Sequence, residues 1–194
     1  MSDAFPRAIR FVLAHEGGLG DHPDDPGGLT NHGVSARAYP GLEVAALTGA
    51  QAVALYRRDY WDKLRLGDLP APVALAVFDA AVNCGRATAA LMLQRAYNRV
   101  GAWGRLEEDG WLGPLTRTAI QTLGTSHPER VYTLAHRMLL IRARFYADLA
   151  KQRRFATFLR GWVLRVADLA DELDADLARP QGPASKDLEI ESRR

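Results

Sequence analysis

The chain has 194 residues and a mass of 21.3 kDa, which suits one compact domain or two small lobes. Its 47% hydrophobic and 25% charged residues are typical of a soluble globular protein and exclude collagen-like, disordered and coiled-coil classes. The net charge of +2 is too small for a dedicated nucleic-acid binder, no apolar run is long enough for a membrane helix, and the single cysteine excludes an internal disulfide.

Helix and turn signals alternate through the first hundred residues. A helix is expected over residues 4–16, where Phe5, Ile9 and Val12 share one stripe before Gly17-Gly18. The turn-rich segment that follows, with a strand-like run over 29–34, predicts a small β-hairpin or a structured loop. Further helices are expected over 48–64 (opened by a capping box of Thr48 and Gln51), 72–83 and 87–100. The helix over 72–83 is apolar nearly all round, which predicts that it lies at the centre of the fold.

The second half is predicted to be helical as well. Pro114 opens a short helix to about Gly124, and Ser126 with Glu129 forms a second capping-box pattern, which starts a helix through about Leu149. The last helix, about 154–177, carries an apolar stripe of Phe158, Trp162, Val166, Leu169 and Leu173. From Pro180 the chain is polar, and a frayed tail is expected.

The charges of the second half are unevenly distributed. Residues 130–165 hold nine Lys and Arg side chains against one acid, Asp148, whereas residues 168–176 hold five acids. The basic stretch could attract an anionic polymer such as a cell wall or a nucleic acid, or it could be a solvated helix face.

Glu16 stands out because helical spacing places it on the apolar stripe of Phe5, Ile9 and Val12. It also lies at the C-terminal end of the predicted helix. Partial burial and the helix dipole both favour a protonated carboxyl group there, which is what glycosidic cleavage needs in a general acid. Alternatively, the helix ends one residue earlier and Glu16 points into solvent.

The loop after Glu16 offers a second carboxylate. Asp21, Asp24 and Asp25 precede Pro26-Gly27-Gly28, and a hairpin here would bring a carboxylate and the Thr30 hydroxyl opposite the helix end. Two carboxyl groups across a cleft are typical of glycoside hydrolases. We assign Asp24 to turn formation and Asp25, beside the rigid Pro-Gly-Gly, to the site.

Several motifs in order resemble the glycoside hydrolase family 108 N-acetylmuramidases. They are His15-Glu16-Gly17-Gly18, the run from Asp25-Pro26-Gly27-Gly28 to Val34, Tyr60-Trp61, the run from Phe78 to Gly85, Leu93-Gln94-Arg95-Ala96, the run from Asp109 to Thr116, and the run from Gly161 to Val166. The resemblance covers about residues 4–170. It departs from the family at Leu19, where an aromatic residue is frequent, and at Asp21-His22, where Asn-Asp is frequent.

The resemblance implies a lysozyme that cleaves the β-1,4 bond between N-acetylmuramic acid and N-acetylglucosamine, with Glu16 as the catalytic acid. Such proteins are encoded by phages and prophages, as endolysins, and by bacterial secretion loci. The spacing of Glu16, Asp25 and Thr30 is also similar to that of the phage-type lysozymes, except that Thr30 is one residue closer to Asp25.

The fold class that we expect is mainly α, a lysozyme-like α+β fold with a small β-hairpin after the first helix and a helical second lobe. Residues 1–86 would form the muramidase lobe, 87–178 a helical C-terminal lobe resembling a predicted peptidoglycan-binding region, and 179–194 a flexible polar tail. Within 93–120, Leu93-Gln94, Asp109-Gly110, Gly113 and Thr116 resemble the general peptidoglycan-binding pattern, and this half is either such a module or the second side of the cleft.

Other polar and aromatic residues are candidate sugar contacts. Asp79 and Asn83 share one face of an apolar helix, so they either satisfy each other or line the cleft, with Asn83 the better candidate contact. Tyr60 and Trp61 could stack on sugars or belong to the core, and His32 is a further candidate contact. No histidine or acid spacing matches a zinc motif, so we expect no metal and no cofactor.

The sequence therefore predicts a peptidoglycan hydrolase in which Glu16 is the acid and Asp25, supported by Thr30, activates water with inversion. The alternatives are a lytic transglycosylase, which needs no second carboxylate, and a non-catalytic peptidoglycan-binding or secretion-activating protein. The expected partner is the peptidoglycan glycan strand, without nucleic acid or stable membrane insertion, and a monomer is expected. With no signal peptide visible, cytoplasmic synthesis is expected, followed by release to the wall through a holin or an export system.

Overall fold

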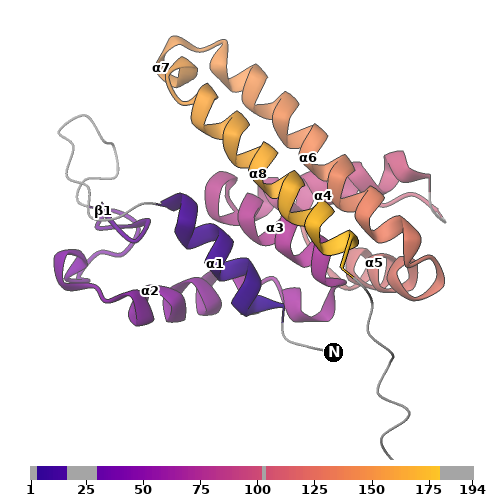
Figure 1. Cartoon of the computed structure of the whole chain (residues 1–194), viewed down its shortest axis with the longest axis horizontal. Helices are drawn as coiled ribbons and strands as arrows, with labels where there is room; N and C mark the ends of the chain where they lie inside the picture. The colour runs from indigo at the N-terminus through magenta and orange to yellow at the C-terminus, as the bar shows by residue number, and fades with distance from the viewer. Residues whose placement is uncertain (1–3, 17–29, 102–103, 180–194) are drawn as a thin grey trace, which may run out of the picture.

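The structure is a computed structural model that describes residues 4–16, 30–101 and 104–179. It is mainly helical and lysozyme-like, with one two-stranded antiparallel hairpin (Figure 1). In chain order the elements are α1 (Phe5–Glu16), β1 (Thr30–Asn31), β2 (Val34–Ser35), η1 (Val44–Ala46), α2 (Gly49–Tyr56), η2 (Arg57–Asp62), η3 (Leu66–Asp68), α3 (Ala71–Cys84), α4 (Arg86–Val100), α5 (Pro114–Ser126), α6 (Glu129–Ala150), α7 (Arg153–Ala156) and α8 (Leu159–Leu177).

Helix α3 lies at the centre, as its apolar sequence predicts. Every residue from Pro72 to Ala81 is buried, and the helix packs against α1, α4 and α6. One hydrophobic core continues from α1 through α3 and α4 to α6 and α8. Helices α6 and α8 run side by side as a long pair that projects beyond the rest of the bundle (Figure 1). No described helix combines the length and the apolar character that crossing a membrane requires.

Ion pairs hold α1 against α8, although the two helices lie at opposite ends of the sequence. Arg7 binds Glu172, with Nε 2.6 Å from Oε1, and also pairs with Asp176. Near the C-terminal end of α1, His15 Nε2 lies 3.0 Å from Asp168 Oδ2. The two helices therefore run antiparallel, and part of the acidic stretch over 168–176 is explained by this contact.

The hairpin follows α1 in the chain and is short, as predicted. Thr30 pairs with Ser35 and Asn31 with Val34. The buried Asn31 side chain donates through Nδ2 to the carbonyl oxygens of Val44 at 3.2 Å and Leu47 at 3.1 Å, which fixes the hairpin to the segment before α2.

The two predicted capping boxes have different outcomes. At Thr48 the box is present: the Thr48 side chain accepts a hydrogen bond from the Gln51 backbone N–H, and the Gln51 side chain accepts one from the Thr48 backbone N–H. The helix it starts is shorter than expected, since α2 passes into the π-helical turn η2 after Tyr56. The second box is wrong: Ser126 ends α5, Pro128 occupies the N-cap of α6 without a side-chain cap, and Glu129 instead contacts His127 Nδ1 at 3.1 Å.

Candidate functional site

Glu16 is the last residue of α1, and its side chain is 18% exposed. Its Oε1 accepts a hydrogen bond from Arg165 Nη1 at 2.7 Å, and no partner for Oε2 is found among the described residues. The sequence predicts the place of Glu16 at the helix end, and the structure adds its partner, a guanidinium from the other half of the chain that forms a charge-assisted hydrogen bond with it.

The hairpin packs directly on Glu16 through Gly33. This glycine has φ +75°, and a Cβ built on it would lie 2.6 Å from Glu16 Cβ and 2.4 Å from the Tyr56 hydroxyl oxygen. The Tyr56 hydroxyl in turn donates to the His32 carbonyl at 3.0 Å. Only glycine permits both this backbone conformation and this close approach, so Gly33 sets the distance between the hairpin and the acid.

Behind Glu16 lies a buried cluster of alternating charges. Arg165 binds Asp79 Oδ1 through Nε at 2.9 Å and Nη2 at 2.6 Å, and Arg142 Nη1 pairs with Asp79 Oδ2. Asp79 and Arg142 are fully buried and Arg165 nearly so. Burial raises the pKa of Asp79, but the two guanidinium charges outweigh this effect and hold the pKa below its ordinary value. Asp79 therefore stays ionised and fixes Arg165, which holds Glu16.

The cluster continues along α3 and α6 to Asn83. Arg142 Nε donates to the Tyr146 hydroxyl at 2.6 Å, and that hydroxyl donates to Asn83 Oδ1. The Cys84 thiol contacts the same hydroxyl at 3.3 Å, and the Tyr146 ring stacks on Trp162 with 4.7 Å between centroids. The sequence left open whether Asp79 and Asn83 satisfy each other or line the cleft. In the structure each has a partner elsewhere in the protein: Asp79 binds Arg142 and Arg165, and Asn83 binds Tyr146.

The remaining predicted residues are placed differently. Thr30 and His32 are half-buried in the hairpin, and Tyr60 is half-buried with its ring 5.9 Å from that of Tyr56. The prediction of a sugar contact at Trp61 is wrong: its side chain is 2% exposed and packs edge-on against Phe5 and Phe78. Asp25 lies outside the described residues.

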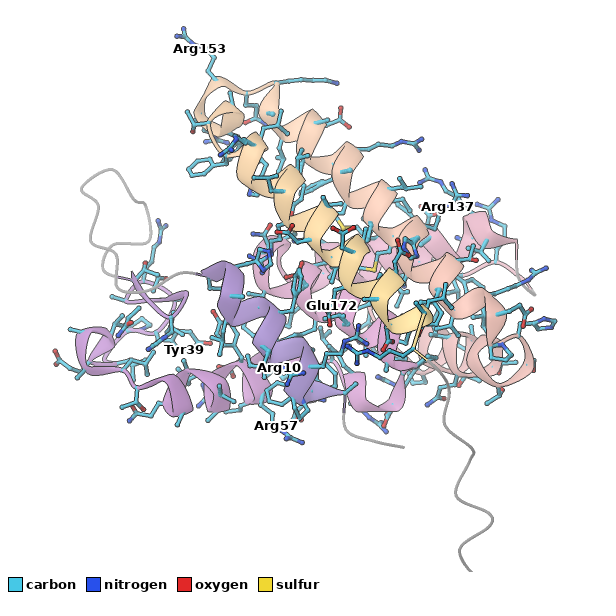
Figure 2. The ribbon with its side chains drawn as sticks, in the orientation of Figure 1. Arg10, Tyr39, Arg57, Arg137, Arg153 and Glu172 are labelled. Atoms are coloured by element: carbon cyan, nitrogen blue, oxygen red, sulfur yellow. The ribbon has the colours of Figure 1, made fainter. Side chains whose placement is uncertain are left out.

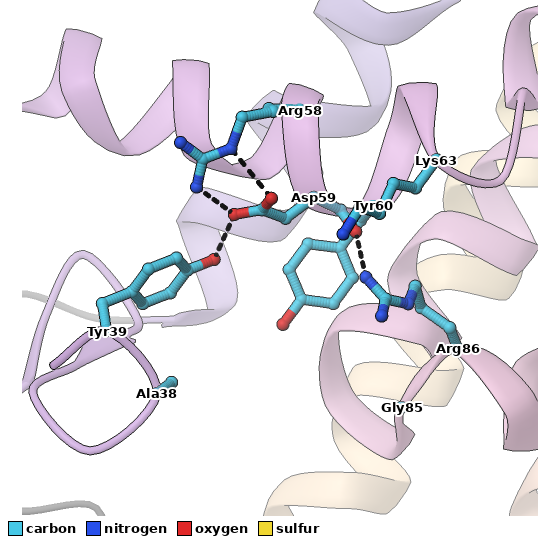
Figure 3. A pocket seen from close by; sticks show the side chains of 8 residues that line it. All are labelled: Ala38, Tyr39, Arg58, Asp59, Tyr60, Lys63, Gly85 and Arg86. Carbon is cyan, nitrogen blue, oxygen red and sulfur yellow. Dashed lines mark hydrogen bonds and ion pairs between the residues drawn. The ribbon is translucent and has the colours of Figure 1, made fainter.

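A basin lies beside Tyr60 (Figure 3), with a volume of about 470 Å³. Its lining comprises Ala38, Tyr39, Arg58, Asp59, Tyr60, Lys63, Gly85 and Arg86. Asp59 is at its centre: its carboxylate accepts from Arg58 and from the Tyr39 hydroxyl at 2.9 Å, and its carbonyl accepts from Arg86 Nη1 at 2.7 Å. The basin thus carries more positive than negative charge.

Arg142 and Arg165 are the site residues that the sequence reasoning missed, because they were grouped with a basic stretch. The signal was their spacing. Arg142 lies four residues after Met138 and four before Tyr146, and Arg165 lies four before Leu169, so each falls on the buried face of its helix. No group of three or more His, Cys, Asp or Glu side chains suited to a metal ion occurs within 4–16, 30–101 and 104–179.

Comparisons with known proteins show the family of this chain. The model of the glycosyl hydrolase 108 family matches residues 9–85, and the model described as a predicted peptidoglycan domain matches residues 88–167. The solved structure of Brucella abortus SagA is 33% identical, with a TM-score of 0.66, over 88% of this chain and 94% of that chain. The chain belongs to the glycosyl hydrolase 108 family. A search of curated proteins found no match.

The two matched regions of this glycosyl hydrolase 108 protein meet in the buried cluster. Glu16 and Asp79 belong to the hydrolase region, whereas Arg142 and Arg165 belong to the peptidoglycan region. The family and the second region together support a role in hydrolysing or binding peptidoglycan. In this member of the family, the candidate acid is held by an arginine that the peptidoglycan region supplies.

Proposed function

We propose that this protein is an N-acetylmuramidase, which hydrolyses the β-1,4 bond between N-acetylmuramic acid and N-acetylglucosamine. Glu16 is the general acid: it gives its proton to the glycosidic oxygen as the bond to the anomeric carbon breaks. The observation that carries this proposal is the placement of Glu16. Its carboxyl group is partly exposed at a helix end, with one oxygen held by Arg165 and the whole side chain backed by the hairpin at Gly33.

Arg165 is a positioning residue in this proposal. Its guanidinium is bonded to two carboxylates, those of Asp79 and Glu16, and the buried Asp79 is also neutralised by Arg142. Asp79 therefore fixes the orientation of the Arg165 guanidinium, and the guanidinium in turn fixes Glu16 Oε1. Oε2 is the oxygen that faces the substrate and delivers the proton. A preorganised acid of this kind lowers the cost of reaching the transition state.

Asp25, supported by Thr30, is proposed as the general base. It takes a proton from the water that attacks the anomeric carbon on the face opposite Glu16, which gives inversion. Thr30 is the first residue of the hairpin, and the hairpin turn packs on Glu16 at Gly33. This closeness to Glu16 supports the role of Thr30. Tyr60, His32 and Asn83 complete the proposal as sugar contacts, in a cleft between lobes formed by residues 1–86 and 87–178.

The deciding experiment is a digest of purified peptidoglycan by the wild type, by Glu16→Gln and by Glu43→Gln. Glu43 lies in the same half of the chain, is exposed, and forms no side-chain capping hydrogen bond. Its variant is therefore the matched control for the loss of one carboxylate. The products are reduced with borohydride and identified by mass spectrometry. Reducible N-acetylmuramic acid ends from the wild type and the control, but not from Glu16→Gln, are expected.

Other products would point elsewhere. Anhydro-muramic ends would make the protein a lytic transglycosylase and remove the role of Asp25. Fragments from Glu16→Gln at the wild-type rate would remove Glu16 as the acid. No fragments from any variant, with the protein sedimenting with the wall, would leave a peptidoglycan-binding protein. Asp25→Ala tests the base separately: near-normal hydrolysis by this variant would contradict its assignment.

A further inference from the structure

Two more depressions extend the basin of Figure 3 into one groove. The second, of about 460 Å³, shares Lys63 and Arg86 with the basin and reaches Trp111. The third, of about 550 Å³, shares Trp111 with the second and ends at Leu115. We call these three adjoining depressions the Tyr60–Leu115 groove. It begins in the hydrolase region and ends in the peptidoglycan region.

The groove begins close to the candidate acid. Tyr60 lines its first basin, and the Tyr60 ring pairs with that of Tyr56, whose hydroxyl holds the hairpin backbone at His32. Burial raises the pKa of Tyr60, while the positive charge of Arg86 lowers it and the negative charge of Glu16 raises it. Tyr60 therefore lies within the electrostatic reach of both the acid and the groove.

Two cations at the junction of the first two depressions form no ion pair with a carboxylate of the described residues. Asp59, the acid of the basin, is already bound by Arg58 and Tyr39 (Figure 3). Arg86 donates to the Asp59 carbonyl rather than to a carboxylate, and Lys63 forms no ion pair with any described residue. Both Lys63 and Arg86 are exposed. This part of the groove is therefore prepared for an anion.

Trp111 is an exposed aromatic ring on a rigid loop. It is 67% exposed, unusual for tryptophan in a folded protein, and Leu115 beside it is 83% exposed. The buried Gln94 binds the loop through the Asp109 carboxylate at 2.6 Å, the Trp111 carbonyl at 3.1 Å and the Gly110 N–H at 2.9 Å. The loop is thus preorganised, which makes the ring a suitable anchor for a ligand.

Hydrogen bonds and close packing beside the groove join the two regions. Arg117 donates to the carbonyl oxygens of Leu64 and Leu112, each at 2.9 Å, so it connects one wall to the other. Gly110 has φ +72°, and a Cβ there would lie 3.0 Å from the Ala87 carbonyl oxygen. The distance between the cations and the Trp111 ring is therefore set by the fold.

We propose that the Tyr60–Leu115 groove binds the peptide stem of peptidoglycan, with Lys63 and Arg86 binding its carboxylates and Trp111 packing against its apolar part. The peptide is favoured over the glycan by charge. Intact glycan strands carry their lactyl groups as amides and are uncharged, whereas the stem peptides carry free carboxylates. This inference rests on the proposed function, because it assumes peptidoglycan as the substrate of the same site.

The test is calorimetric titration of the full chain with a soluble disaccharide-tetrapeptide. This probe lacks the internal bond that the proposed activity cleaves, so it stays intact. Lys63→Ala/Arg86→Ala is expected to weaken binding by about 10-fold or more, and Trp111→Ala by about 10-fold. The control Arg137→Ala/Arg153→Ala removes the same charge from sites away from the basin (Figure 2) and should bind normally, as should Leu177→Ala, which truncates another exposed apolar residue.

Two further probes identify the ligand group. The same disaccharide-tetrapeptide with its carboxylates converted to amides should bind the wild type as weakly as the intact probe binds the double variant. A β-1,4-linked oligosaccharide of N-acetylglucosamine, which carries no peptide and no lactyl carboxylate, should bind more weakly than the intact probe. The inference is overturned if the amidated probe or this uncharged oligosaccharide binds as tightly as the intact probe, or if both double variants bind alike.

These measurements separate the inference from the proposed function. Thermal melting confirms that each variant is folded, and all substituted side chains except Arg137 are exposed. A wild type that releases no reducing ends, yet binds the intact probe through Lys63 and Arg86, would reject the muramidase and support the groove. If the wild type cleaves peptidoglycan but the groove variants bind the probe normally, the muramidase is supported and the groove inference is rejected.

Discussion

Replacing Gly33 by alanine should disturb both the stability and the chemistry of the protein. The position has φ +75°, which is unfavourable for alanine, and the new methyl group would lie 2.4 Å from the Tyr56 hydroxyl oxygen and 2.6 Å from Glu16 Cβ. Ordinary contacts of a methyl group are 3.4–4 Å, so the hairpin and Glu16 must separate by about 1 Å.

The chain offers a control that isolates the contact from the backbone. Gly41 has φ +86°, but a Cβ there meets nothing within 4 Å. Gly41→Ala therefore carries the backbone cost alone, about 1–2 kcal/mol. Gly33→Ala carries that cost and an overpacking cost of about 2 kcal/mol, which corresponds to a further Tm decrease of about 4–8 °C.

The assays are thermal unfolding followed by circular dichroism and the release of reducing ends from peptidoglycan. Because a misplacement of about 1 Å at a catalytic group can reduce the rate by about 100-fold, Gly33→Ala should lose activity on that scale at temperatures where it is folded. Gly41→Ala should keep its activity. Equal melting temperatures and equal activities for the two variants would refute the reasoning, since the contact with Glu16 would then be without consequence.

Three further predictions concern the buried residues. Asp79→Asn should destabilise the fold by about 3–5 kcal/mol in urea unfolding at neutral pH, because Arg142 and Arg165 lose their shared carboxylate. The pKa of Asp79 is lowered in the fold, so its contribution to the free energy of unfolding is complete above the ordinary value of about 3.9 and declines as the pH falls below it. If the difference in free energy of unfolding between wild type and variant does not become smaller in acid, this reasoning is contradicted. Arg165→Lys, which keeps the charge but lacks the rigid planar fork that holds both carboxylates, should reduce hydrolysis of peptidoglycan by about 10-fold or more, and unchanged kinetics would remove its positioning role. Trp61→Ala should cost about 3–5 kcal/mol of stability while peptidoglycan binding by the folded fraction stays normal; a selective loss of binding would restore its role as a sugar contact.

Much of the fold could be predicted from local sequence patterns. The apolar character of α3 and the capping box at Thr48 are determined by residues close together in the chain, whereas the glycine-rich turn predicted after Glu16 lies outside the described residues. The position of Glu16 at the end of α1 and the hairpin after it could be predicted for the same reason. The second capping box failed because Pro128, which lies between its members, occupies the N-cap.

The support of the candidate acid could not be predicted in this way. Arg165 contacts Asp79 across 86 residues and Glu16 across 149, and Arg142 contacts Asp79 across 63. No local pattern specifies such partners. An arginine on an apolar stripe indicates only that a buried anion is needed somewhere. Trp61 shows the same limit, because an aromatic residue at helical spacing can face the core or a ligand.

The separation of Glu16 and Arg165 along the chain has a consequence for synthesis. A ribosome makes α1 before α8, so a nascent chain that carries Glu16 lacks the Arg165 guanidinium until another 149 residues have been added. The pairs of Arg7 and His15 with α8 form equally late. A product that terminates before Arg165 would therefore contain the candidate acid without the side chain that holds it.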